Sequence, residues 1–161
     1  MSEIKINIAA QTLTVFNNGG QLVNHYLISS ARNGVGEVNG SYCTPRGRHF
    51  VRAKIGAGLP VNAVFVKRRH TGEVYSSKLG GRYPGRDWIL TRILWLSGCE
   101  VGYNRLHNVD TMRRFIYIHG SPDSIEMGKP GSIGCIRMRN FDILELFGLV
   151  DIGTRTMIHE S

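Results

Sequence analysis

Glycine is the residue that most constrains how this chain can fold. Twenty of its 161 residues are glycine, and they are scattered along the sequence without a period. Several follow asparagine, and both residue types tolerate the positive φ angles of tight turns. A chain interrupted by so many turns is expected to form short strands rather than long helices.

Stretches of alternating or β-branched residues agree with this expectation. The predicted strands are residues 4–8, 12–16, 22–28, 61–66, 115–118 and 154–158. Residues 17–20 (Asn-Asn-Gly-Gly) predict a hairpin turn between the second and third strands. One helix is expected to start at Asn140 as its N-cap and to stop at Gly148. The glycine-rich, basic stretch 70–86 is expected to be a long loop or a flap.

These patterns predict one mainly-β domain over residues 1–161, with no linker or repeat. The longest apolar run, residues 88–96, is interrupted by Arg92 and is far shorter than the roughly 18 residues of a membrane span. Residues 1–8 alternate polar and apolar side chains and lack the apolar segment of a secretory signal. We therefore expect a cytoplasmic protein, or a periplasmic one if the sequence has been trimmed.

The formal net charge of +8 favours an anionic ligand. The basic residues form short clusters, such as 67–69 and 113–114, without a nucleic-acid-binding motif, so nucleic acid is not an expected partner. Three cysteines give neither a disulfide framework nor a CxxC zinc pattern. The six histidines include no pair at helical ligand spacing, so neither a metal nor an organic cofactor is expected.

Residues 119–139 contain side chains suited to nucleophilic attack on an acyl carbon. A thiol such as that of Cys135 has a free pKa of about 8.5 and becomes a good nucleophile when an imidazole lowers that pKa. His119 closes a predicted strand and Cys135 follows a loop, so the two side chains can meet. Gly131 and Gly134 allow close approach of a substrate and free backbone N–H groups to bind an oxyanion.

Each of these residues also has a plain structural explanation. A lone cysteine is usually a small buried apolar residue, and a histidine at a strand end is usually only hydrogen-bonded there. Arg137 could clamp a substrate carboxylate, but a single arginine is more often simply solvated. Spacing alone leaves the catalytic and the structural interpretation open.

The sequence around these residues resembles a known family. Residues 118–121 (Ile-His-Gly-Ser) and 128–140 (Gly-Lys-Pro-Gly-Ser-Ile-Gly-Cys-Ile-Arg-Met-Arg-Asn) resemble the signature of YkuD-type L,D-transpeptidase catalytic domains. Residues 44–47 (Thr-Pro-Arg-Gly) and the pair 153–154 (Gly-Thr) resemble further family motifs. The resemblance covers nearly the whole chain. It implies a single-domain β-sandwich with one or two short helices.

The resemblance also implies roles for individual residues. Cys135 would be the nucleophile and His119 its general base, with the backbone N–H groups of Gly134 and Cys135 forming the oxyanion hole. The residues expected to bind the substrate or support the site are Arg137, Ser132, Gly120 and Ser121. Cys43 and Cys99 match no motif and are expected to be structural. Ile133 stands where many members carry histidine, which bears on substrate fit.

The implied substrate is a peptidoglycan tetrapeptide stem. Attack of the thiol on the L-centre carbonyl of meso-diaminopimelate would expel D-Ala and leave a thioester. Water would then make the protein an L,D-carboxypeptidase that recycles muropeptides, which we favour from the expected cytoplasmic location. An amine acceptor would instead make it a cross-linking L,D-transpeptidase.

A third hypothesis is a non-catalytic binder of peptidoglycan fragments or nucleic acid, because a fold does not fix a function. Reactivity of the thiols distinguishes this hypothesis from the two catalytic ones. A catalytic Cys135 is expected to have a lowered pKa and to be alkylated faster than Cys43 or Cys99.

Overall fold

The computed structural model describes residues 2–161. Ten strands and two helices follow one another along the chain in the order β1 (Glu3–Asn7), β2 (Thr12–Phe16), β3 (Leu22–Leu27), β4 (Gly47–Ile55), β5 (Ala63–Val66), β6 (Arg69–Val74), α1 (Ser77–Arg82), β7 (Ile89–Gly98), β8 (Tyr117–Ser121), β9 (Ile136–Arg139), α2 (Asn140–Leu149) and β10 (Arg155–His159). This confirms the predicted mainly-β fold with two short helices. No helix within residues 2–161 is long and apolar enough to cross a membrane.

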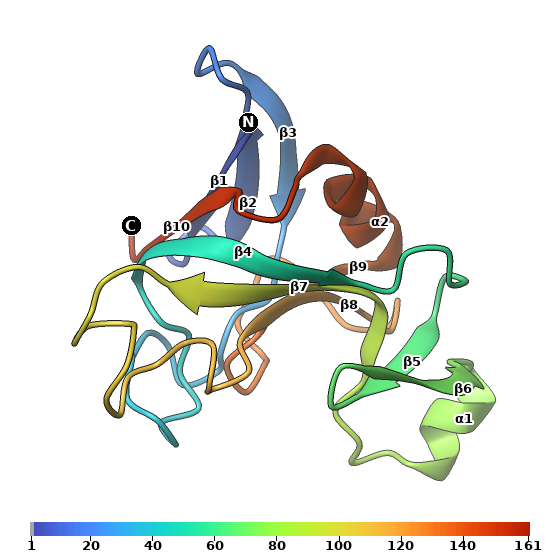
Figure 1. Cartoon of the computed structure of the whole chain (residues 1–161). Helices are drawn as coiled ribbons and strands as arrows, with labels where there is room; N and C mark the ends of the chain where they lie inside the picture. Colours follow the sequence, from blue (N-terminus) through green and yellow to red (C-terminus); the bar gives the residue numbers. More distant parts are fainter. Residues whose placement is uncertain (1) are drawn as a thin grey trace.

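All ten strands belong to one curled sheet (Figure 1). Its main path runs β3-β2-β1-β10-β4-β7-β5-β6, and β8 leaves this path to pair with β7 and β9. The layers of the expected sandwich are thus parts of one sheet. In Figure 1, β1–β3 rise steeply from β4 and β7, whereas β5, β6 and α1 form the opposite end of the molecule.

The main hydrophobic core lies between the N-terminal strands and the β8–β9–α2 unit. Alternate residues of β1 and β2 are fully buried, as the period of a half-buried strand requires. Their partners come from β8, β9 and α2. The central members of this core are Ile4, Ile6, Leu13, Val15, Ile118, Ile136, Met138, Ile143 and Leu146. The core therefore fixes β8 and β9, the two strands that carry the predicted site.

The strands predicted near the two ends of the chain are confirmed to within two residues. The prediction of a loop at residues 70–86 is wrong, because β6 and α1 occupy most of that stretch. The helix α1 is capped by Ser76, whose Oγ accepts a hydrogen bond from the Leu79 N–H at 3.1 Å. Two glycines inside α1 made this helix hard to see in the sequence.

The predicted ends of two other elements also need correction. The N-cap of α2 is Arg139 rather than Asn140, and Gly148 lies inside the helix instead of ending it. The strand β8 starts at Tyr117, because Phe115 has a φ of 57° and leaves the extended conformation.

Four strands are absent from the predicted set: β4, β6, β7 and β9. Almost every residue of β7 is buried, so this strand shows no alternation of polar and apolar side chains. The strand β9 has only four residues and carries two arginines.

Candidate active site

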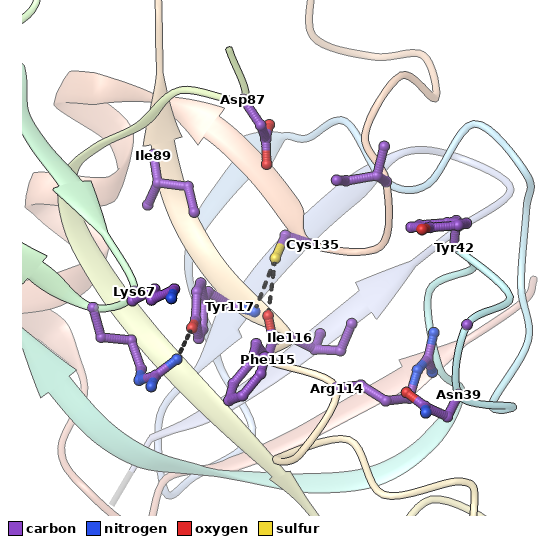
Figure 2. A pocket seen from close by; sticks show the side chains of 13 residues that line it. Asn39, Tyr42, Lys67, Asp87, Ile89, Arg114, Phe115, Ile116, Tyr117 and Cys135 are labelled. Atoms are coloured by element: carbon purple, nitrogen blue, oxygen red, sulfur yellow. Dashed lines mark hydrogen bonds between the residues drawn. The ribbon is translucent and has the colours of Figure 1, made fainter.

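Cys135 borders a cavity of about 720 Å³ at the end of the loop that leads into β9 (Figure 2). Its Sγ accepts a hydrogen bond from the Tyr117 N–H and donates one to the Phe115 carbonyl, both at 3.3 Å. Tyr117 and Phe115 lie where the chain enters β8. The thiol is therefore fixed against the start of the strand that carries His119.

The loop before Cys135 is held by a compact set of hydrogen bonds. The Ser132 hydroxyl donates to the Cys135 carbonyl at 2.5 Å and accepts from the Gly134 N–H at 3.2 Å. Thr44 donates from its Oγ1 to the Gly134 carbonyl at 2.9 Å. Gly134 has a φ of 140°, and a Cβ there would lie 3.2 Å from the Cδ1 of Ile116. This backbone suits glycine alone.

His119 lies in β8, is only 1% exposed and pairs in register with Arg137 of β9. Its Nδ1 lies 2.6 Å from the Gly120 carbonyl, so Nδ1 carries the proton and donates this bond. Nε2 is then the ring nitrogen able to accept a proton. Ile93, the cross-strand partner of His119 in β7, belongs to the same apolar cluster as Tyr117 and Cys135. Within residues 2–161, no hydrogen bond joins His119 to the Cys135 thiol.

Burial is the main influence on the pKa values of the Cys135 thiol and the His119 imidazole. It raises the pKa of the Cys135 thiol to about 12, against the opposing effects of the Tyr117 N–H, Arg137 and Arg114. Burial also lowers the pKa of His119. The site therefore holds a neutral thiol and a neutral imidazole at neutral pH. This differs from the expectation of a lowered thiol pKa, because the opposing charges do not compensate for desolvation.

A second cavity, of about 800 Å³, adjoins the first. The two share three lining residues: Tyr42, Asp87 and Ile133. Arg137 borders the second cavity and donates from Nη1 to the Gly131 carbonyl and from Nη2 to Asp87 Oδ1, both at 3.1 Å. Asp87 and the Cys135 loop are thereby connected through one guanidinium.

Cationic side chains border both cavities. The first cavity is bordered by Lys67, Arg68 and Arg114, and the second by Arg32, Arg86 and Arg137. Arg68 donates to the Tyr117 hydroxyl at 2.7 Å, and Arg114 donates to the Cys43 carbonyl at 2.6 Å. Guanidinium groups held in this way are suited to binding carboxylates.

The predicted site residues differ in whether they border one of the two cavities. Cys135 borders the first cavity, Ser132 and Arg137 border the second, and Gly134 shapes the loop between them. Gly134 donates its N–H to Ser132, so it is not available as an oxyanion donor in this state. Within residues 2–161, the N–H of Cys135 has no hydrogen-bond partner and is available.

Gly120 and Ser121, predicted to lie on the substrate side, lie inside the sheet instead. A Cβ on Gly120 would meet the Asn140 side chain at 2.5 Å and the Leu90 carbonyl at 2.7 Å. Ser121 is 1% exposed and donates from its hydroxyl to the Met138 carbonyl. Like His119, neither borders either cavity, and both stabilise the β8–β9 pair.

Other residues that border the cavities were not identified from the sequence, or were identified without a functional role. Arg68 and Arg114 were recognised only as members of basic clusters, and Asp87 carried no signal in the sequence. Ile133 is 57% exposed and borders both cavities, in keeping with an influence on substrate fit. Cys43 and Cys99 are free thiols that border neither cavity.

No group of three or more His, Cys, Asp or Glu side chains within residues 2–161 could hold a metal ion. Beside the thiol of Cys135, the charged side chains that border the cavities are one carboxylate, one lysine and five arginines. This set can bind anions and transfer a proton at sulfur.

This curled β fold, with a cysteine at arginine-lined cavities and a buried histidine in the strand beside it, is that of a mainly-β catalytic domain. The chain belongs to the L,D-transpeptidase catalytic domain family (YkuD), whose model matches residues 2–158.

Two curated relatives match this chain over a short stretch. The YkuD protein of Bacillus subtilis (strain 168) is 48% identical over 42 residues, which are 26% of this chain and 26% of that protein. Its counterpart from Bacillus licheniformis is 51% identical over 41 residues, covering 26% and 25% of the two chains. The matched stretch thus spans about a quarter of each relative.

Solved structures match over nearly the whole chain. L,D-transpeptidase 3 from Mycobacterium tuberculosis has a TM-score of 0.59 at 18% identity, covering 99% of this chain and 61% of that chain. An L,D-transpeptidase from Mycobacterium smegmatis has a TM-score of 0.57 at 18% identity, covering 98% and 59%. These similarities show the fold.

Proposed function

We propose that this protein catalyses acyl transfer from a peptidoglycan tetrapeptide stem through a thioester at Cys135. Of residues 2–161, Cys135 is the only cysteine that borders either cavity, and its Sγ accepts a hydrogen bond from the Tyr117 N–H in the strand that carries His119. This placement is the observation that carries the proposal. Sγ attacks the L-centre carbonyl of meso-diaminopimelate, a C–S bond forms, and the amide C–N bond to D-Ala breaks.

Proton transfer in this step follows from the tautomer of His119. Because Nδ1 donates to the Gly120 carbonyl, Nε2 takes the proton of the thiol and passes it to the departing amine of D-Ala. The free N–H of Cys135 is the donor nearest to the oxyanion that develops on the attacked carbonyl. A thiol that is neutral at rest gives up its proton only as it attacks, which protects it from reacting without a substrate.

The cationic lining supports a substrate with several carboxylates. Arg114 is fixed by the Gly36 and Cys43 carbonyls, and its charge acts to lower the pKa of the Cys135 thiol. Arg137 lies two residues beyond the thiol and has the planar donor geometry that fits a carboxylate. A tetrapeptide stem has several carboxylates that such groups can bind.

The second cavity favours an amine acceptor. Water needs no binding site of its own, whereas a second stem peptide needs a cavity that reaches the thioester. The 800 Å³ cavity shares Asp87 and Ile133 with the cavity of Cys135, so it provides such access. We therefore propose transpeptidation as the main reaction. Hydrolysis by a cytoplasmic carboxypeptidase remains a prediction from the sequence, to be tested by product analysis and cell fractionation.

The test is mass spectrometry of the protein incubated with a diaminopimelate-containing tetrapeptide, with and without a second stem as acceptor. We expect loss of D-Ala and a stem-to-stem adduct that Cys135→Ala abolishes and that Cys99→Ala retains. A tripeptide formed equally with and without acceptor would favour the carboxypeptidase. The absence of any turnover by the wild-type protein would contradict both and favour the non-catalytic binder.

A further inference from the structure

Asp87 has a unique position among the acidic residues of the site. Of residues 2–161, it is the only carboxylate that borders either cavity, and it borders both. In Figure 2 its carboxylate points toward Cys135 from across the cavity. The other charged side chains that border the two cavities are all lysine or arginine, in a protein with an excess of positive charge.

The two carboxylate oxygens of Asp87 have different environments. Oδ1 accepts from Arg137 Nη2 at 3.1 Å, in an ion pair whose side chains are 37% exposed for Asp87 and 16% for Arg137. Within residues 2–161, no group donates to Oδ2. One oxygen therefore orients the arginine, and the other is free to bind a ligand.

A free carboxylate oxygen beside an oriented guanidinium matches one ligand chemistry well. An amino-acid centre with an ammonium and a carboxylate on the same carbon presents the two opposite charges at a short, fixed separation. The ammonium can bind Asp87 and the carboxylate can bind Arg137. A ligand with carboxylates alone would be repelled by Asp87, and a simple amine would leave Arg137 without a partner.

We propose that Asp87 is the specificity-determining residue for the acceptor stem of this reaction, whose primary amine lies on a zwitterionic amino-acid centre. This inference rests on the proposed acyl transfer. The ammonium binds Oδ2 at the junction of the cavities, beside the thioester of Cys135. Arg137 binds the neighbouring carboxylate and thereby orients the nitrogen toward the thioester carbonyl.

The chemical step is balanced without a further reactant. The ammonium loses one proton to solvent, and the neutral nitrogen attacks the thioester carbonyl. The amide C–N bond forms and the C–S bond breaks. A second proton of the nitrogen passes through His119 to Sγ, which restores the thiol.

A binding experiment tests this inference without turnover. In the Cys135→Ala background, a tripeptide stem ending in meso-diaminopimelate is titrated by calorimetry beside the same peptide with its side-chain amine acetylated. We expect the free amine to bind about tenfold more tightly than the acetylated form, since a hydrogen bond to a charged group is involved. Asp87→Asn should abolish this difference, whereas Asp87→Glu and the surface control Glu126→Gln should retain most of it. Equal binding of the two peptides before Asp87 is changed would overturn the inference.

A turnover experiment separates this inference from the proposed function. With Cys135 intact, Asp87→Asn should lower the ratio of amide product to hydrolysis product about tenfold while D-Ala release continues. If Asp87 only positions Arg137, the substitution should instead slow D-Ala release and leave that ratio unchanged, which would overturn the inference. If the wild-type protein releases no D-Ala, the proposed function fails, and the calorimetric difference still decides the role of Asp87.

Discussion

At the scale of single residues, the main consequence of the structure is that burial keeps the Cys135 thiol protonated. Its pKa of about 12 means that the reactive thiolate is scarce at neutral pH. We predict that alkylation of Cys135 by iodoacetamide rises about tenfold per pH unit above neutrality and reaches no plateau below about pH 10. Peptide-resolved mass spectrometry separates it from Cys43 and Cys99.

The same protein unfolded in urea serves as the control for this prediction. In the unfolded protein, the rate of alkylation of Cys135 should stop rising with pH near the ordinary thiol pKa of about 8.5. A plateau below neutral pH in the folded protein would instead reveal a preformed thiolate–imidazolium pair. Slow alkylation reverses the sequence-based expectation, because sequence cannot show how deeply a thiol is desolvated.

The residues of the site differ in how far sequence could predict them. Cys135 and His119 were predictable because their motif lies within one short stretch of the chain. Asp87 was not, because its partner Arg137 is 50 positions away and the loop between α1 and β7 has no pattern that marks a single acid as functional. Ser121 looked functional because it belongs to the same motif as His119, but its hydroxyl is buried and donates to the Met138 carbonyl inside the sheet.

At the scale of secondary-structure elements, the end of α2 shows how distant contacts override local signals. Gly148 is a strong stop signal in sequence, yet the helix continues to Leu149. Lys54 of β4 donates from Nζ to the carbonyls of Phe147 and Val150, at 2.6 and 2.7 Å. These bonds satisfy carbonyls that a helix end would otherwise leave unpaired. Sequence gives no indication that β4 supplies them.

Since Gly148 lies inside a helix, exposed and without a positive φ, an alanine there should be stabilising. A Cβ at this position meets nothing within 4 Å. We predict that Gly148→Ala raises the free energy of unfolding by about 0.5–1 kcal/mol, as measured in urea. Gly120→Ala is the opposing control and should destabilise, because its Cβ meets the Leu90 carbonyl at 2.7 Å. Destabilisation by Gly148→Ala would show that α2 ends earlier.

At the scale of the whole molecule, the sheet brings together segments that are far apart in sequence. The segment between β3 and β4 lies against the Cys135 loop through bridges that join Ser29 to Arg137 and Ala31 to Ser132. Thr44, in the motif just before β4, bonds both the Ala31 N–H and the Gly134 carbonyl. The motif around residue 44 thus helps to hold the Cys135 loop in place.

The stability of the whole molecule should also depend on buried histidines. His49 is 1% exposed, with its ring nitrogens on the Gly47 carbonyl and the Thr111 hydroxyl at 3.0 and 2.9 Å. Burial lowers its pKa from 6.5 to about 4. As pH falls below about 6.5, His49 binds a proton in the unfolded chain, whereas in the folded protein it stays neutral down to about pH 4. Stability is therefore lost between these two pH values.

We predict that, between about pH 7.5 and 4.5, His49 alone accounts for a loss of about 2–3 kcal/mol in the free energy of unfolding. His49→Gln should remove this share of the pH dependence, whatever its effect on stability at neutral pH. His107→Gln, which changes an exposed histidine, should leave the dependence as in the wild type. Urea unfolding of the three proteins across this range is the measurement. If His49→Gln and wild type lose stability in parallel, His49 binds its proton equally in the folded and unfolded states, and the buried neutral ring is contradicted.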